Sequence, residues 1–249
     1  MGITTAYSVL PAYWRELNGI SVMMTFYAAI GSYRIKVRDG HKVPYIQKLG
    51  KLHEISIPEF TVWSILLWEF MTYDELKKYY DEQIKALGVK APSLDELLEF
   101  LLRRKLIAKG VGYTGCDALY NMLSVAFVVP YQFNGGRRFW TLLKLWICGK
   151  IRFLDLLSLV RETRGTDDEA RVLALVEQTP LSTSELIRCF ERGIQDVSTP
   201  EKVIAAVYPE EDNDQAHIAS EEMLSAYTNS VLQAVSNLYL SRKVILELA

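Results

Sequence analysis

The chain carries one leucine-rich pattern twice, as LDELLEFLLRRKLI at residues 94–107 and as LQAVSNLYLSRKVI at residues 232–245. The two stretches align without a gap, and each has apolar residues at helical spacing before an Arg-Lys pair and an aliphatic run. Cations suit the last turn of a helix because they oppose the negative end of its dipole. Each stretch therefore predicts a core-facing helix that ends near the basic pair and continues into a short strand.

The helix before each copy begins with the same signal. Thr72 to Glu75 and Ser182 to Glu185 are capping boxes, in which the hydroxyl accepts from a backbone amide and the carboxylate reaches back. Apolar helices are expected before them, over 58–71 and 169–178, and the first is apolar on nearly all sides, which predicts burial all round. A further capping box, Ser93 to Glu96, opens the first leucine-rich copy. The predicted order is three short helices and a strand, twice.

This order, with Arg-Lys and an aliphatic strand after the third helix, resembles the winged-helix (helix-turn-helix) superfamily in two tandem copies, without singling out one family. The resemblance covers about 61–113 and 169–249. It implies a mainly α fold with small β elements, as tandem winged-helix-like units joined by a helical basic segment. The expected divisions are an N-terminal segment 1–60, a first unit 61–130, a basic aromatic connector 131–165, and a second unit 166–249 with an irregular acidic insertion at 194–220.

The N-terminal segment contains a β-hairpin signal. Tyr33 to Val37 and Lys42 to Ile46 are short β-like runs, and Asp39-Gly40 between them is typical of a tight turn. Pro44 predicts that the second strand lies at a sheet edge, because proline cannot donate to a neighbouring strand. For residues 114–129 two interpretations stay open, a helix opened by Thr114 or a strand at 127–129.

No catalytic, metal-binding or cofactor-binding motif is found. The three cysteines and three histidines are scattered, and neither a Gly-x-Ser-x-Gly nor a Gly-x-x-x-x-Gly-Lys sequence occurs. We therefore expect a protein that is not an enzyme and needs no metal or cofactor. The sequence shows no secretory signal pattern, and its longest apolar stretches are shorter than the ~20 residues that a spanning helix needs. A cytoplasmic protein without membrane contact is expected.

Charge is unevenly distributed along the chain. Residues 131–165 hold seven basic and two acidic side chains, whereas residues 166–249 hold six basic and fifteen acidic ones. The winged-helix resemblance implies DNA binding and transcription regulation, and phosphates attract a basic surface. The candidate nucleic-acid-binding residues are Arg137, Arg138, Lys144, Lys150, Arg152, Lys77, Lys78, Thr228, Asn229 and Gln233. The alternative interpretation of the basic side chains is a solvated helix face.

An aromatic face accompanies the basic connector. Phe139, Trp140, Leu143 and Trp146 share one side of the expected helix. They predict either an interface, with a protein partner or in a homodimer, or an inter-domain core helix. The sequence thus leaves two functions open, a DNA-binding regulator acting as a dimer or a winged-helix module that docks protein and not DNA. The acidic residues of helix 94–103 favour the second, because carboxylates oppose phosphates.

Overall fold

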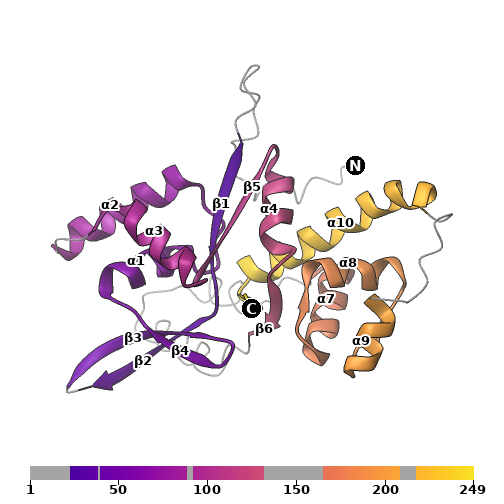
Figure 1. The fold of residues 1–249 in the computed structure, drawn as a ribbon, viewed down its shortest axis with the longest axis horizontal. Helices are drawn as coiled ribbons and strands as arrows, with labels where there is room; N and C mark the ends of the chain where they lie inside the picture. The colour runs from indigo at the N-terminus through magenta and orange to yellow at the C-terminus, as the bar shows by residue number, and fades with distance from the viewer. Residues whose placement is uncertain (1–22, 39, 89–91, 132–164, 208–216) are drawn as a thin grey trace, which may run out of the picture.

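The computed structural model describes residues 23–38, 40–88, 92–131, 165–207 and 217–249 (Figure 1). The first half contains β1 (Met24–Ala29), β2 (Ser32–Arg38), β3 (His41–Lys48), β4 (Lys51–Glu54), α1 (Ile57–Leu66), α2 (Tyr73–Leu87), α3 (Leu94–Arg103), β5 (Ile107–Gly112), α4 (Gly115–Leu123) and β6 (Phe127–Pro130). The second half contains α7 (Asp167–Gln178), β7 (Leu181–Ser182), α8 (Thr183–Glu191), α9 (Pro200–Val207), α10 (His217–Leu240) and β8 (Val244–Glu247).

The strands of the described residues form three small sheets. β1 pairs with β5, β2 to β4 form a meander, and β6 lies between β7 and β8. Helix accounts for 51% and strand for 24% of the structure, so the expectation of a mainly α fold is wrong and the fold is mixed α and β. The sequence analysis underestimated the strands because most are short and find their partners far along the chain.

The two halves share one order of elements around a central strand. Tyr27 of β1 lies opposite both Lys109 of β5 and Met71, the residue before the Thr72 cap of α2. Val128 of β6 likewise lies opposite both Leu246 of β8 and Leu181, the residue before the Ser182 cap of α8. In each half, therefore, the central strand comes first in the chain, and a helix, a short pairing segment, further helices and an edge strand come later. The first half also has the β2–β4 meander before its first helix, and the second half has α9 between α8 and α10.

The repeated leucine-rich stretches occupy equivalent places in the two halves. Their structural correspondence is shifted by one residue from the gapless sequence alignment. Lys105 and Arg242 both adopt the left-handed conformation, with φ of 53° and 64°. The next amide in each case reaches back into the helix, Leu106 N to Leu101 O and Lys243 N to Leu238 O, both at 2.9 Å. The alignment pairs Lys105 with Lys243, whereas the turn pairs it with Arg242, because the buried leucines set the position at which each helix ends.

Two apolar clusters form the core. One joins β1, β5 and the helices α1, α2 and α3, and its Trp63 is fully buried and donates from Nε1 to Ile30 O at 3.0 Å. The other joins α7, α8, α10, β6 and β8, and it also includes Met122 and Leu123 of α4 and Ala28 of β1. The clusters share β1 as a wall, so the two halves pack on each other.

Tyr239 of α10 links the two halves by hydrogen bonds between its hydroxyl and backbone groups of the first half. Its side chain is fully buried, and its hydroxyl lies 3.2 Å from both Ala29 O and Leu66 O and accepts from Trp68 N at 3.1 Å. Burial raises the pKa of this phenol far above its ordinary value. Gly31 adds a backbone link, since its N–H donates to Leu246 O at 2.7 Å.

The N-terminal hairpin is confirmed, but its expected edge position is wrong. β2 pairs with β3 from Ser32 opposite Gln47 to Arg38 opposite His41. β3, which contains Pro44, is the central strand of the meander. The proline is tolerated because the β3–β4 ladder begins only at Tyr45, and Pro44 contributes a carbonyl that accepts from Ile55 N at 3.5 Å.

Three other local expectations are resolved. The helix expected over 58–71 ends at Leu66, because Trp68 takes a left-handed φ of 62°. For 114–129 both interpretations hold in part, since α4 is followed by β6. The strand expected at the end of the chain is confirmed as β8.

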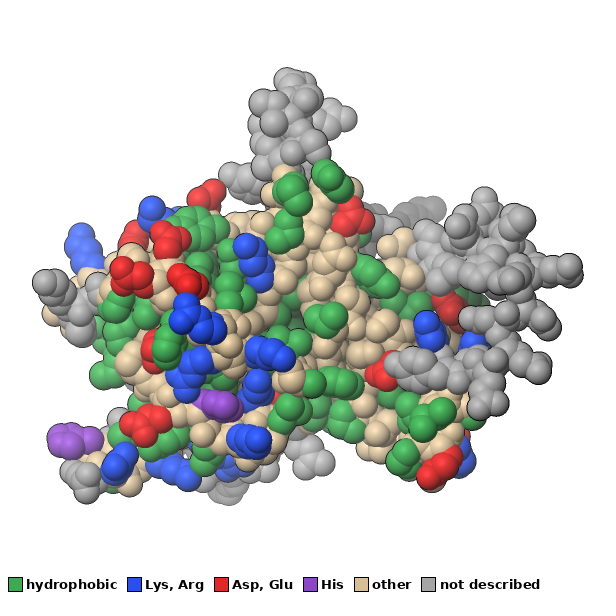
Figure 2. Space-filling view, viewed as in Figure 1, with side chains coloured by type: hydrophobic (Ala, Val, Ile, Leu, Met, Phe, Trp, Pro, Cys, Tyr) green, Lys and Arg blue, Asp and Glu red, His purple; other side chains and the backbone are tan. Residues whose placement is uncertain are grey.

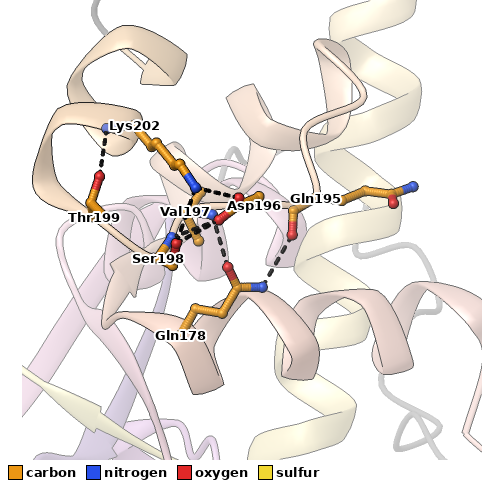
Figure 3. Close-up of polar contacts among 7 residues, drawn as sticks. All are labelled: Gln178, Gln195, Asp196, Val197, Ser198, Thr199 and Lys202. Carbon is orange, nitrogen blue, oxygen red and sulfur yellow. Dashed lines mark hydrogen bonds and ion pairs between the residues drawn. The ribbon is translucent and has the colours of Figure 1, made fainter.

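The insertion at 194–220 is not irregular throughout, since it contains α9 and the start of α10. Figure 3 shows the polar contacts that order the loop before α9. Gln178 bridges Gln195 O at 3.1 Å and Val197 N at 2.9 Å, and Asp196 accepts from Lys202 Nζ at 2.5 Å. The hydrogen bond from Lys202 leads the contacts that lower the pKa of Asp196 to about 2. These contacts depend on side chains that meet only in the folded chain.

Glu247 makes stability depend on pH. It is 7% exposed, its carboxylate accepts from Leu49 N at 3.0 Å, and burial raises its pKa above 4.5. The folded chain therefore binds this proton more readily than the unfolded chain, and the contribution to stability is present below pH 4.5 and lost as pH rises through the raised pKa. Glu247→Gln keeps an acceptor oxygen but does not ionise. We therefore expect its free energy of unfolding to rise relative to that of the wild type between pH 4 and pH 8.

Urea unfolding of both proteins across that pH range measures the difference. Glu82→Gln, on the exposed side of α2, is the matched control and should follow the wild type at every pH. A difference between Glu247→Gln and the wild type that stays constant with pH would contradict the raised pKa.

Candidate functional site: an apolar groove between strand β2 and helix α1

A groove of about 430 Å³ lies between the meander and the first helix. Its walls come from β2, from the outward face of α1 and from the turn after α1, with one cation from the second half. The lining residues are Tyr33, Ile35, Phe60, Trp63, Ser64, Leu67, Trp68 and Arg242. The expectation that helix 58–71 is covered all round is therefore wrong, because its outward apolar face is a wall of this groove.

Aromatic rings define one end of the groove. Phe60 and Trp63 lie on α1 and stack with their centroids 6.2 Å apart, and the Tyr33 ring meets Phe60 edge-on at 6.0 Å. The capping box of Ser56 and Glu59 fixes the first turn of α1 and so the direction in which Phe60 points. Such packed, rigid aromatic side chains lose little conformational entropy when a ligand binds.

Trp68 forms the other end in a strained conformation. A left-handed φ is costly for a bulky residue, about 1–2 kcal/mol, and Trp68 has a φ of 62°. Its amide donates to the Tyr239 hydroxyl, the Arg242 guanidinium lies 5.2 Å above its ring, and the Tyr131 ring packs at 5.4 Å. The indole Nε1 is shielded from solvent and has no hydrogen-bond partner within the described residues. Strain with an unused donor is typical of binding sites.

β2 presents an open edge beside the groove. It is the outer strand of the meander, and within the described residues no backbone hydrogen bond joins it to anything but β3. Tyr33, Ile35 and Val37 share one face and are 43%, 54% and 71% exposed. Arg34, Lys36 and Arg38 alternate with them on the other face. An exposed apolar edge strand is a template for pairing with another chain.

A second surface is positively charged. Lys and Arg side chains gather between the C-terminal end of α3 and the meander in Figure 2. The gathered cations include Lys48, Lys51, Arg104 and Lys105. Burial and then the charge of Lys105 lower the pKa of Lys48. Burial and then the charge of Arg104 lower the pKa of His53. The buried His53 Nε2 has no partner within the described part of the chain. This cation cluster could hold an anion.

Among the predicted nucleic-acid-binding residues, those that the structure describes lie in both halves of the molecule. Lys77 and Lys78 are exposed on α2, whereas Asn229 and Gln233 are exposed and Thr228 is half-buried on α10, in the other half of the molecule (Figure 1). Arg137, Arg138, Lys144, Lys150 and Arg152 lie outside the described residues. The predicted interface residues Phe139, Trp140, Leu143 and Trp146 also lie outside them.

Comparisons with protein-family models, curated proteins and solved structures find no match. Within the described ranges, no three His, Cys, Asp or Glu side chains gather in a way that could hold a metal ion. No described helix combines the length and apolar character needed to cross a membrane. The chemistry available at the groove is apolar contact, ring stacking, hydrogen bonding by backbone groups and by the Ser64 hydroxyl, and the positive charge of Arg242.

The sequence analysis missed the groove although two signals pointed to it. One is the alternation of apolar and basic residues from Tyr33 to Arg38, in a hairpin with no assigned neighbour on one side. The other is the α1 helix with almost no polar face. Trp68 and Arg242 had no such signal, because they come together only when the two halves pack.

Proposed function

We propose that the chain is a non-enzymatic protein-recognition module of two tandem winged-helix-like units, which docks a protein partner in the groove beside β2. The observation that carries this proposal is the exposed apolar groove next to a strand edge that pairs with no other described residue. Exposed apolar surface beside aromatic and arginine side chains is typical of protein interfaces.

The helices that would contact DNA in a winged-helix-like unit are α3 and α10, and their side chains favour protein docking over DNA binding. On α3 the exposed side chains include Asp95, Glu96 and Glu99, which would oppose phosphates. On α10, Ser230 donates to Asp168, and Asn237 donates to Glu169 at 3.0 Å. These two polar side chains are engaged within the second half and are not available for base edges.

A photo-reactive residue at Ser64, which is exposed in the groove, tests the proposal in cell extract. We expect adducts of discrete mass that contain protein and survive nuclease treatment. The matched control is the same residue at Tyr79, exposed on α2, which should give no such adducts. Adducts that disappear with nuclease, or equal labelling from both positions, would contradict a protein-docking groove.

DNA binding is the second candidate, and the cation cluster is the observation that favours it. If it holds, duplex DNA is retained in a gel-shift experiment at about 50 mM salt and released as salt rises. Lys51→Glu should then weaken retention for every sequence, while Lys85→Glu on α2 should not. Absence of retention at low salt removes this candidate.

A further inference from the structure

The outer edge of β2, which pairs with none of the described residues, indicates the length and conformation of a partner that could bind there. β2 has seven residues, or about 23 Å at about 3.3 Å per residue, so it can pair with an extended segment of six or seven residues. Pairing would satisfy the backbone groups that face away from β3. It would also place every second side chain of the added strand over the groove, beside Tyr33 and Ile35.

The other side chains of an added strand would meet positive charge. They would lie beside Arg34, Lys36 and Arg38, on the face of the meander opposite to the groove. Arg34 Nε donates to Gln47 at 2.5 Å, Lys36 lies 5.6 Å from the Tyr45 ring and Arg38 is 3.7 Å from Glu54, so this basic row is held over β3 and β4. Opposite charges on neighbouring strands stabilise their pairing.

We infer that β2 binds an extended acidic peptide of a partner protein as a fourth strand of the meander, with apolar side chains in the groove and carboxylates beside Arg34, Lys36 and Arg38. This inference rests on the proposed protein-docking function and specifies its partner. Backbone hydrogen bonds supply affinity in such strand addition, and the alternating side chains supply specificity.

The charge argues against two other occupants. A second copy paired antiparallel through β2 would place the two basic rows beside each other on one face, and like charges on neighbouring strands are destabilising. An extended segment from residues 132–164, which carry seven basic and two acidic side chains, would meet the same repulsion. An acidic peptide alone turns the basic row into an attraction.

Fluorescence anisotropy with the full-length chain tests the inference. The probe is a labelled eight-residue peptide of alternating valine and glutamate, and its control replaces glutamate with lysine. We expect binding of the first and at least about tenfold weaker binding of the second, because the basic row reverses the sign of the interaction. Equal affinity for both peptides, or no binding of the valine–glutamate peptide at millimolar concentration, overturns the inference.

Two N-methylated versions of the valine–glutamate peptide test strand pairing directly. Methyl groups on the valine amides block one edge of the peptide, and methyl groups on the glutamate amides block the other. Since only one edge faces β2, we expect one version to lose at least about tenfold in affinity and the other to bind as before. If both bind like the unmodified peptide, the groove takes a ligand without strand addition and the inference fails.

Variants of the protein locate the site. Ile35→Lys should reduce affinity for the valine–glutamate peptide at least about tenfold, while Leu52→Lys, at the exposed surface of β4 in the same sheet, should not. A dimer of the free protein that Ile35→Lys dissociates would show that a second copy occupies the edge, and would overturn the inference.

The peptide and cross-linking experiments together separate the inference from the proposed function. If the peptide does not bind but Ser64 still forms cross-links, strand addition is rejected and the protein-docking function remains. Failure of both experiments rejects both.

Discussion

Gly110→Ala is expected to lower the free energy of unfolding by about 3 kcal/mol. A Cβ at this position would lie 2.0 Å from Ala118 O and 2.6 Å from Met122 Cβ, both on α4. α4 lies directly on β5, and backbone atoms cannot rotate away as the end of a flexible side chain can. The strand or the helix must therefore move, which disturbs the wall shared by the two apolar clusters. Chemical denaturation of the variant and the wild type measures the loss.

Gly193→Ala separates the clash from the conformational cost of replacing a glycine. Gly193 has a left-handed φ of 67° and nothing within 4 Å of an added Cβ. Its replacement should cost only about 1 kcal/mol, from backbone strain. If Gly110→Ala costs no more than this control, close packing of α4 on β5 is not what requires glycine at position 110.

Tyr239→Phe is expected to cost about 2–3 kcal/mol of stability although it removes a single oxygen atom. The substitution leaves Trp68 N without its acceptor and removes the single hydroxyl hydrogen that lies between Ala29 O and Leu66 O, at a fully buried site. A buried polar group left without a partner loses its full hydration free energy, whereas removing an exposed one costs little. Unfolding followed by circular dichroism measures the change.

Tyr45→Phe is the matched control for Tyr239→Phe. The Tyr45 hydroxyl donates to Glu54 at 3.2 Å in an exposed position, so its loss should change stability by about 0.5 kcal/mol or less. Equal costs for the two substitutions would show that the Tyr239 hydroxyl does not hold the halves together. Since Tyr239 also positions Trp68, the tyrosine links stability to the shape of the groove.

Sequence reasoning about the repeat was correct on helix starts and wrong on register, and it did not predict α9 within the second half. Thr72 and Ser182 open α2 and α8 as full capping boxes, as predicted. Ser93 is at the start of α3, where its hydroxyl accepts from the Glu96 amide. The gapless alignment nevertheless placed Lys105 against Lys243, because similarity of letters rewards the Arg-Lys pair. The left-handed residue after each helix depends instead on which leucines reach the core, and this pairs Lys105 with Arg242.

Helix starts, turns and the alternation along β2 follow from residues close together in the chain, because a cap, a tight turn or a strand face involves neighbours within four positions or so. The choice of which strands pair with each other does not follow from such close neighbours. β1 pairs with Met71 and with β5, which both lie far along the chain from it. β6 likewise pairs with β7 and β8, which follow it in the chain by about fifty residues or more. The groove belongs to this second kind, since Arg242 meets Trp68 only after the two halves have packed around Tyr239. Long-range contacts of this sort depend on shape and burial in the folded chain, which local patterns do not encode.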